Sequence, residues 1–424
     1  MRSSESLLTK IENLDIFIGD GNYAGKYPKA NELLDHGVPF ISAKDFNGRL
    51  FSDVDMRYIS KELHSKLLKG HTKHNDILIV VRGNGVGKVS LVPKKYSDCN
   101  LNAQLALLRP NSDYINPKYL YYLLSSDKYY KMFNDYSSGS AQPQLTISAI
   151  KKVPVKIVPK KIQDEIANIL SSLDDKIELN NKINKNLEEL AQTLYKRWFV
   201  DFEFPNEDGE PYKSSGGEMV DSEFGTLPKG WIITDLGDIC ITVLGGTPSR
   251  GNPEYWNGSI NWINSGEINK VRIIEPSEKI TKLGLDKSST KLMPKKTTVI
   301  AITGATLGAV SLLEIESCAN QSVIGIYEND NIPYSYIYAL IKDRIHDLIG
   351  RQTGGAQQHI NKNDVNSLKI IVPEHNLLKK FHFILSNFHD EIANRMFQNK
   401  YLSKLRDELL PKLMNGEIEV PIKE

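Results

Sequence analysis

The chain carries one long sequence pattern twice. A Gly-rich stretch ending in Gln residues, a short Val/Pro-rich strand and a long heptad-patterned helix occur before residue 200 and again near the C-terminus. The first copy reads SSGSAQPQLTISAIKKVPVKIVPKKIQDEIANIL and the second QTGGAQQHINKNDVNSLKIIVPEHNLLKKFHFIL. Gly139 aligns with Gly354 and Gln142 with Gln357 at one constant offset. Solenoid repeats are only a few tens of residues long, so this is a duplicated domain. It predicts a molecule that grips two similar sites on one long ligand.

The totals set the broad class. A chain of 424 residues has room for two or three domains. The N-terminus lacks the apolar run of a signal peptide, and no stretch approaches the roughly 18 apolar residues of a membrane span. Cys99, Cys240 and Cys318 are far apart and show no C-x-x-C spacing, which favours a reducing, cytoplasmic location and argues against structural zinc. The nine histidines form no H-x-x-x-H or H-E-x-x-H motif, so no metal site is predicted.

The nearly neutral net charge conceals an uneven distribution. Residues 1–160 hold 23 Lys and Arg against 15 Asp and Glu, whereas residues 161–226 hold 7 against 15. A basic domain is either merely soluble or adapted to a polyanion, and charge alone leaves both possibilities open. The acidic helix that follows indicates a different role for that segment.

Two long helices follow the two copies. Both show apolar residues at 3-4 spacing, and such a seam needs a partner in water. Packing of each helix on its own domain is one possibility; an antiparallel pair is favoured, with Asn180 near Arg395. The seam residues predicted for this pair are Ile166, Ile169, Leu173, Ile183, Leu187, Leu190, Leu194, Phe381, Ile384, Phe388, Leu402, Leu405 and Leu409.

The remaining segments complete a provisional domain map. Residues 75–92 form two apolar runs around a Gly-rich turn, which predicts a hairpin, and residues 116–133 read as a helix with Pro117 just inside its start. A Gly-, Pro-, Ser- and acid-rich stretch reads as a mobile linker. The predicted map is domain one at 1–155, first helix at 156–200, linker at 201–226, domain two at 227–372, and second helix with tail at 373–424.

Several uncommon motifs resemble one protein family. The run RWFVDFEFPNEDGEPYKSSGGEMVDSEFGTLPKGW, at 197–231, closely resembles the central region of specificity subunits of type I restriction-modification enzymes. The next run, WIITDLGDICITVLGGTPSRGNPEYW, carries the Gly-Gly-Thr-Pro-Ser signature of their target recognition domains after a Pro-x-Gly-Trp start. Residues 19–42 resemble the opening of another recognition-domain type. The first domain departs from the pattern because it lacks the Pro-x-Gly-Trp start, which leaves its first strand undefined.

The resemblance implies both a fold and a role. The fold is α+β: two α/β target recognition domains, duplicated with pseudo-two-fold symmetry and separated by two long antiparallel coiled-coil helices. The implied role is non-catalytic recognition of a bipartite, asymmetric double-stranded DNA target, one domain per half-site. The helices would dock two methyltransferase subunits, and restriction and translocase subunits would join that core. The complex would use S-adenosylmethionine, ATP and Mg²⁺ on other subunits, with no cofactor and no membrane contact on this chain.

Catalytic look-alikes fail in their sequence context. RGNGVGKVS has Arg82 where a P-loop needs Gly and Val89 where it needs Ser or Thr, and no helix is predicted to follow its glycines. Asn252-Pro253-Glu254-Tyr255 resembles the motif of DNA amino-methyltransferases, but no cofactor loop accompanies it, so it reads as a turn. A fused enzyme and a protein-binding two-headed adaptor are the rival functions. Methyl transfer by the isolated chain would indicate the first, and the absence of salt-dependent duplex binding the second.

Polar loop residues remain as candidates for DNA contact. Gln and Asn pair with adenine, and Arg and Lys with guanine, in the major groove. Each candidate could instead cap a turn or face solvent. The predicted DNA-binding residues are Lys26, Arg82, Asn84, Lys88, Gln104, Gln142 and Gln144 in domain one, and Thr247, Ser249, Arg250, Thr303, Thr306, Gln321, Gln357, Gln358 and His359 in domain two.

Overall fold

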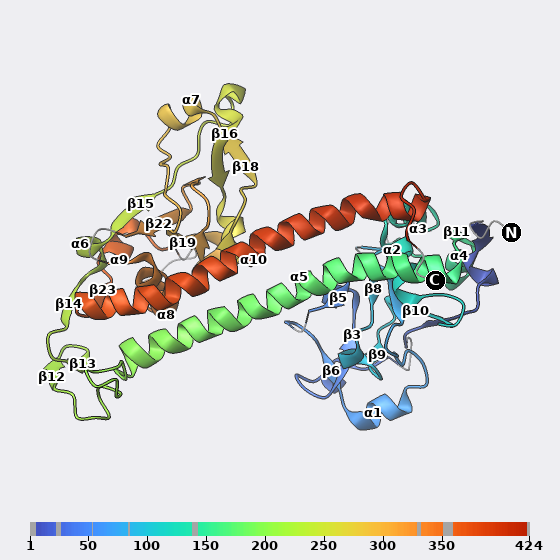
Figure 1. Cartoon of the computed structure of the whole chain (residues 1–424), viewed down its shortest axis with the longest axis horizontal. Coiled ribbons are helices and arrows are strands. Elements are labelled where there is room, and N and C mark those ends of the chain that lie inside the picture. The colour runs from blue at the N-terminus through green and yellow to red at the C-terminus, as the bar shows by residue number, and fades with distance from the viewer. Residues whose placement is uncertain are drawn as a thin grey trace. The chain divides into compact units, whose positions relative to one another are not determined.

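The computed structural model describes residues 6–22, 27–52, 54–83, 85–137, 143–328, 332–350 and 359–421. The chain divides into two compact units. The first contains residues up to 176 and from 401 onward, and the second contains 177–400. Both long helices contribute to both units, so each unit combines one mixed α/β domain with a segment of each helix (Figure 1).

The first unit is built on a four-stranded antiparallel sheet ordered β2-β10-β7-β8. Its strands are Ile16–Asp20, Leu105–Pro110, Ile77–Val80 and Val89–Leu91. A three-stranded sheet, β6-β3-β9, consists of Tyr58–Ile59, Val38–Ile41 and Asn100–Leu101. Two strand pairs complete the unit: β1-β11, Leu7–Lys10 with Pro154–Ile157, and β4-β5, Phe46–Asn47 with Leu50–Phe51. The predicted hairpin is confirmed as β7-β8.

Short helices cover the sheets of the first unit. They are α1 Lys61–Lys66, α2 Pro117–Ser125, α3 Asp127–Asp135 and α4 Ile147–Lys152. Pro117 stands at the first helical position as predicted, and the Asn116 side chain caps the exposed N–H groups there. The prediction of one helix over 116–133 is wrong in one respect. The helix breaks at Ser126, which is both the C-cap of α2 and the N-cap of α3.

The second unit repeats this topology. Its main sheet is ordered β15-β22-β19-β20-β17, from Ile241–Leu244, Val323–Tyr327, Thr298–Ala301, Val310–Leu313 and Arg272–Ile273. A smaller sheet, β18-β16-β21, consists of Glu278–Ile280, Trp256–Ile263 and Cys318–Ala319. A separate strand pair, β14-β23, consists of Ile232–Asp235 and Lys369–Val372. Its helices are α6 Leu236–Ile239, α7 Lys282–Asp286, α8 Tyr334–Gly350 and α9 Lys362–Asn366. The first four strands of the main sheet follow the order of β2-β10-β7-β8, so the duplication seen in sequence is a duplication of fold.

Glycines in the corresponding hairpin turns of the two copies adopt the same left-handed backbone conformation. Gly83 and Gly87 have φ of 84° and 89°, and Gly304 and Gly308 have φ of 73° and 80°. This left-handed region penalises any residue with a Cβ atom. The turn that resembles a phosphate loop therefore joins two strands, β7 and β8, as its context predicted.

The long helices are α5, Lys160–Tyr195, which a π turn extends over Lys196–Val200, and α10, His375–Asn415. In the first unit the start of α5 and the end of α10 share one core, which includes Ile166, Leu170 and Leu413. In the second unit the opposite ends, including Tyr195 and Phe381, share another. These contacts require the helices to run antiparallel, as predicted. Each helix also packs on the domain next to it, so the two packing possibilities coexist.

Polar side chains align the middle of the helix pair. Asn180 is fully buried, and its Nδ2 donates to Gln398 Oε1 at 2.7 Å and to Asn399 Oδ1 at 2.8 Å. The predicted proximity of Asn180 and Arg395 is therefore wrong by about one turn, and Arg395 pairs with Glu391 of its own helix. Leu190, predicted in the seam, is 54% exposed. The heptad register drifts on a straight α-helix, and this drift moves outer positions off the interface.

The acidic segment between the copies is folded, so its interpretation as a mobile linker is wrong. Strands β12, Met219–Ser222, and β13, Gly225–Pro228, pair within it. The Phe204 ring stacks on Tyr212 and Trp231 at centroid distances of 4.5 and 5.3 Å. Aromatic burial thus holds a segment whose Gly, Ser and acidic content suggested mobility. Among the described residues, no helix is both long and apolar enough to cross a membrane.

Candidate DNA-reading edges and the helix-side pocket

Three predicted residues of the first unit lie next to one another where the central strands β7 and β10 of its main sheet meet the neighbouring loops. The Val81 N–H donates to the Gln104 carbonyl at 2.8 Å, and the Leu145 N–H donates to the Val81 carbonyl at 2.9 Å. Arg82 and Gln144 form an antiparallel bridge beside these bonds. Arg82, Gln104 and Gln144 therefore lie on adjoining backbone segments, and we call these three residues the first reading edge.

A residue that the sequence did not single out orients Gln104. Asn102 is 5% exposed; its Nδ2 donates to Gln104 Oε1 at 3.1 Å, and its Oδ1 accepts the Gln104 N–H at 2.9 Å. Because the side-chain oxygen Oε1 of Gln104 accepts the hydrogen bond from Asn102 Nδ2, the side-chain nitrogen Nε2 of Gln104 remains to donate to a ligand. Asn320 holds the corresponding place before β22 and accepts the Ser322 N–H at 3.1 Å. This repeated Asn was the sequence signal for the role.

The second unit builds a matching edge. The Ile302 N–H donates to the Ser322 carbonyl, and the Ile360 N–H donates to the Ile302 carbonyl, both at 3.0 Å. Gln321 precedes the first acceptor, and its Oε1 accepts a 2.5 Å hydrogen bond from Thr247 Oγ1. We call the set of predicted residues here the second reading edge: Thr247, Thr303, Thr306, Gln321 and His359.

Close backbone contacts explain the glycines at the start of each domain. A Cβ atom added to Gly21 would lie 2.0 Å from the Asn102 carbonyl oxygen, and one on Gly245 would lie 2.1 Å from that of Asn320. Only glycine fits at either position. Gly245 is the first glycine of the Gly-Gly-Thr-Pro-Ser motif, so part of that motif positions the segment ahead of the second reading edge.

The last residue of that motif, Ser249, and the arginine after it, Arg250, both contact neighbouring side chains. The Arg250 guanidinium lies 3.7 Å from the Trp256 ring centroid and forms a two-bond ion pair with Glu278, at 2.5 and 3.1 Å. The Ser249 carbonyl accepts the Trp256 indole N–H at 3.2 Å. The ring contact and the ion pair favour a packing role for Arg250 over base contact, whereas Ser249 takes part here through its backbone carbonyl alone. The Asn-Pro-Glu-Tyr segment is a capped 3₁₀ turn beside them, as predicted.

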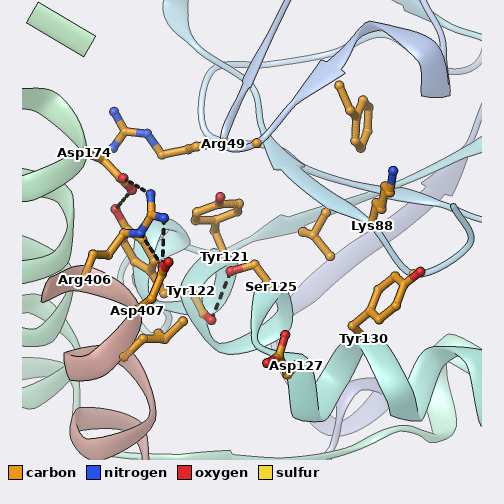
Figure 2. A pocket seen from close by; sticks show the side chains of 15 residues that line it. Arg49, Lys88, Tyr121, Tyr122, Ser125, Asp127, Tyr130, Asp174, Arg406 and Asp407 are labelled. Atoms are coloured by element: carbon orange, nitrogen blue, oxygen red, sulfur yellow. Dashed lines mark hydrogen bonds and ion pairs between the residues drawn. The ribbon is translucent and has the colours of Figure 1, made fainter. Parts of the chain in front are cut away.

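Lys88 lines a pocket of about 430 Å³ in the first unit (Figure 2). The pocket lies where the domain meets α5 and α10. Arg49 there pairs with Asp175 at 2.6 Å, and Arg406 pairs with Asp174 at 2.6 Å. Figure 2 shows Asp174, Arg406 and Asp407 gathered at the helix end of the pocket, with Lys88 and Tyr130 at the other end. These ion pairs indicate that the residues around the pocket hold the domain and the two helices together.

Five predicted DNA-binding residues lie outside the described residues. They are Lys26, Asn84, Gln142, Gln357 and Gln358. The chemistry of both reading edges rests on amide, hydroxyl, imidazole and guanidinium groups, which suit hydrogen bonding to base edges. Burial raises the pKa of the Cys99 and Cys240 thiols to about 12 and that of Cys318 to about 11, so none of the three is a thiolate nucleophile at neutral pH.

Comparison with known proteins gives a consistent result. The family model described as the type I restriction modification DNA specificity domain matches residues 13–189 and 228–399. The specificity subunit of the type I restriction enzyme HindI of Haemophilus influenzae is 27% identical over 438 residues, covering 90% of this chain and 94% of that protein. The specificity subunit of the MjaIX enzyme of Methanocaldococcus jannaschii is 30% identical over 311 residues, covering 73% and 70%.

A solved structure shares the fold. The crystal structure of the type I restriction-modification S subunit from M. genitalium matches with a TM-score of 0.61 and 17% identity, covering 97% of each chain. The family model spans both recognition domains and most of both long helices. The resemblance carried by the central segment and the Gly-Gly-Thr-Pro-Ser motif is thereby confirmed, and the chain belongs to the DNA specificity subunits of type I restriction-modification systems.

Proposed function

We propose that this subunit reads a bipartite, asymmetric DNA target, with one recognition domain on each half-site. The observation that carries this proposal is a duplicated frame that presents different side chains. The first reading edge offers Arg82, Gln104 and Gln144. At the matching strand ends the second offers hydroxyls, Gln321 and His359. Two domains that share a fold but present different side chains at these positions favour two half-sites of different sequence.

Gln104 is the best-supported base reader. A glutamine amide pairs bidentately with adenine N6 and N7, which needs one donor and one acceptor from the side chain. Asn102 fixes the amide, and the second lone pair of the Gln104 Oε1 remains for the adenine N6 donor. A side chain fixed before binding loses less rotamer entropy on the DNA. Arg82, on the same edge, has the chemistry for a guanine or a phosphate.

The helices are proposed to dock two methyltransferase subunits, through which restriction and translocase subunits would join. Large apolar side chains remain exposed along both helices: Leu179, Leu190, Phe383, Phe397 and Tyr401. Their exposed fractions range from 39% to 74%, so each keeps apolar surface that a docked subunit would bury. In this arrangement the target base would be flipped into a methyltransferase pocket on another subunit. S-adenosylmethionine, ATP and Mg²⁺ would bind there and on the restriction subunits.

Four duplexes test the half-site assignment in the reconstituted methyltransferase complex. They carry the intact target, either half scrambled, or both halves scrambled. Gln104→Ala should weaken binding about 5- to 150-fold wherever its half-site is intact, because a bidentate amide–adenine contact is worth about 1–3 kcal/mol. It should leave duplexes with that half scrambled unchanged, because phosphate contacts dominate there.

Gln321→Ala is the matched control from the second domain. It should show the opposite dependence, losing affinity only where the other half-site is intact. Fluorescence anisotropy at two salt concentrations measures both variants. Equal losses on all four duplexes, or a loss by both variants on the same half-site, would show that the edges do not read one half each.

A further inference from the structure

Three side chains converge in the first recognition domain. His64 lies in α1, His71 in the following loop and Asp98 before β9. His64 Nε2 lies 3.5 Å and His71 Nδ1 3.3 Å from Asp98 Oδ1. The imidazole ring centroids are 4.5 Å apart. Within the described parts of the chain, this is the one group of three such side chains with mutually close ligand atoms.

The outer ring nitrogens already face acceptors. His64 Nδ1 contacts Asn100 Oδ1, and His71 Nε2 lies 2.5 Å from the Leu67 carbonyl. The Asn100 amide orientation is fixed, because its Nδ2 points at the Lys69 carbonyl at 3.3 Å. If each neutral ring donates its outer N–H to these oxygens, both inner nitrogens turn a lone pair toward the Asp98 carboxylate. Three acceptors then meet with no donor among them.

With these tautomers, a proton or a metal cation must lie between the three acceptors. Two imidazolium ions could supply it, but their rings would be only 4.5 Å apart with one carboxylate between them. A single divalent cation replaces both protons without that repulsion. Outer N–H groups bonded to carbonyls are also the usual support for metal-bound histidines, because they fix the tautomer and the ring orientation.

The spacing fits a small transition-metal ion. Ligand atoms about 2.0–2.1 Å from zinc in a tetrahedron are about 3.3–3.5 Å from each other. The two histidine–aspartate separations, 3.3 and 3.5 Å, match that edge length. All three ligand atoms lie within 4.8 Å of one another, so a small movement of one ring would complete the triangle. Two imidazoles and one carboxylate suit Zn²⁺ and exclude Mg²⁺, which prefers oxygen ligands.

We propose that His64, His71 and Asp98 form a binding site for a divalent transition-metal ion such as Zn²⁺. Asp98 is 77% exposed, so water would complete the coordination. Its backbone φ is 59°, in the left-handed region that Asp and Asn tolerate better than most residues. His71 lies outside α1 and seven residues after His64, a spacing that matches neither H-x-x-x-H nor H-E-x-x-H, which is why the motif search over the sequence did not find the site.

The site would brace the base of the first reading edge. The Leu101 N–H donates to the Gly70 carbonyl at 3.0 Å, and Asn22 Nδ2 donates to the Lys69 carbonyl at 2.7 Å. The loop that carries His71 is thus bonded to the strand leading into Asn102. Metal binding would hold this loop, α1 and the Asp98 turn together, and so hold the segment that orients Gln104. The role is structural, with no catalytic step.

Isothermal titration of the full chain with ZnCl₂, after EDTA treatment and dialysis, tests the proposal. One zinc ion should bind per chain, and MgCl₂ should give no heat. Asp98→Asn removes the charged ligand while keeping shape and tolerance of positive φ. It should weaken zinc binding at least about tenfold, as should His64→Ala. His74→Ala, an exposed histidine of the same domain outside the group, is the matched control and should bind zinc as the wild type does.

Thermal unfolding with and without zinc adds a readout of folding. Zinc should raise the melting temperature of the wild type and of His74→Ala, and not that of Asp98→Asn. A zinc-free melting temperature of Asp98→Asn close to that of the wild type shows that the variant folds. No zinc binding by the wild type, or equal binding by wild type and Asp98→Asn, would overturn the site.

Discussion

Replacing Arg272 by Met should uncouple the second recognition domain from the long helices. The Arg272 side chain is fully buried, and its guanidinium contacts Glu188 of α5 and lies 3.6 Å from Glu314. Lys342 and Lys296 pair with the same two carboxylates, at 3.3 and 2.9 Å, and Lys296 also reaches Asp390 of α10 at 3.0 Å. Three cations therefore balance three carboxylates, and Arg272→Met leaves a buried negative excess.

The magnitude follows from burial. Removing one partner of a buried ion pair costs about 3–5 kcal/mol. The lower end applies here, because Lys342 and Lys296 still neutralise part of the charge. About 3 kcal/mol corresponds to a melting temperature lower by roughly 6–12 °C for a unit of this size. The double variant Arg272→Met, Glu188→Gln restores the balance and should recover about 0.5–3 kcal/mol.

Differential scanning calorimetry of the full chain measures these shifts. Lys400→Met is the control, because it removes an ion pair with Glu275 whose side chains are both 51% exposed. Such a pair contributes about 0–1 kcal/mol. A loss for Arg272→Met as small as that of Lys400→Met, or a double variant less stable than the single one, would refute the view that this network is a buried, balanced unit.

Three further outcomes follow from the same structure. Burial lowers the pKa of His389 well below 6.5, so at acidic pH the unfolded chain binds a proton that the native chain does not. The free energy of unfolding should therefore be highest above about pH 6.5 and fall by up to about 1.4 kcal/mol per pH unit below it. His389→Gln should reduce this pH dependence in thermal unfolding. Asn180→Asp should destabilise the chain more than Asn180→Leu in the same assay, because a buried carboxylate cannot donate to Gln398 and Asn399; equal effects would contradict the amide pairing. Leu190→Asp should leave the free energy of unfolding within about 0.5 kcal/mol of wild type yet reduce co-purification of methyltransferase subunits, whereas wild-type stoichiometry would exclude Leu190 from docking.

Much of the fold was predictable because it repeats. Two copies of one pattern predicted two domains and an antiparallel helix pair, and each unit contains one mixed α/β domain with a segment of both long helices. The register of the pair was not predictable, because heptad counting cannot distinguish Arg395 from Gln398 as the partner of Asn180. The folded acidic segment was missed because Phe204 packs on Trp231, a contact that composition does not reveal.

The site was predictable in part. Arg82, Gln104 and Gln144 were chosen one by one as polar loop residues, and the fold brings them together. Arg250 was predicted to contact DNA because arginine can pair with guanine, and the contacts with Trp256 and Glu278 that favour packing instead could not be seen in the sequence. Asn102 and the His64, His71 and Asp98 group escaped notice because their roles depend on contacts between distant segments.

The methylated motif in DNA from cells that express this subunit with its methyltransferase subunits tests the central claim most directly. Single-molecule sequencing should show two short, different specified segments separated by an unspecified spacer. Exchanging residues 227–372 for the corresponding domain of another family member should change one segment and leave the other intact. A continuous palindrome, or an exchange that changes both segments, would contradict recognition by one domain per half-site.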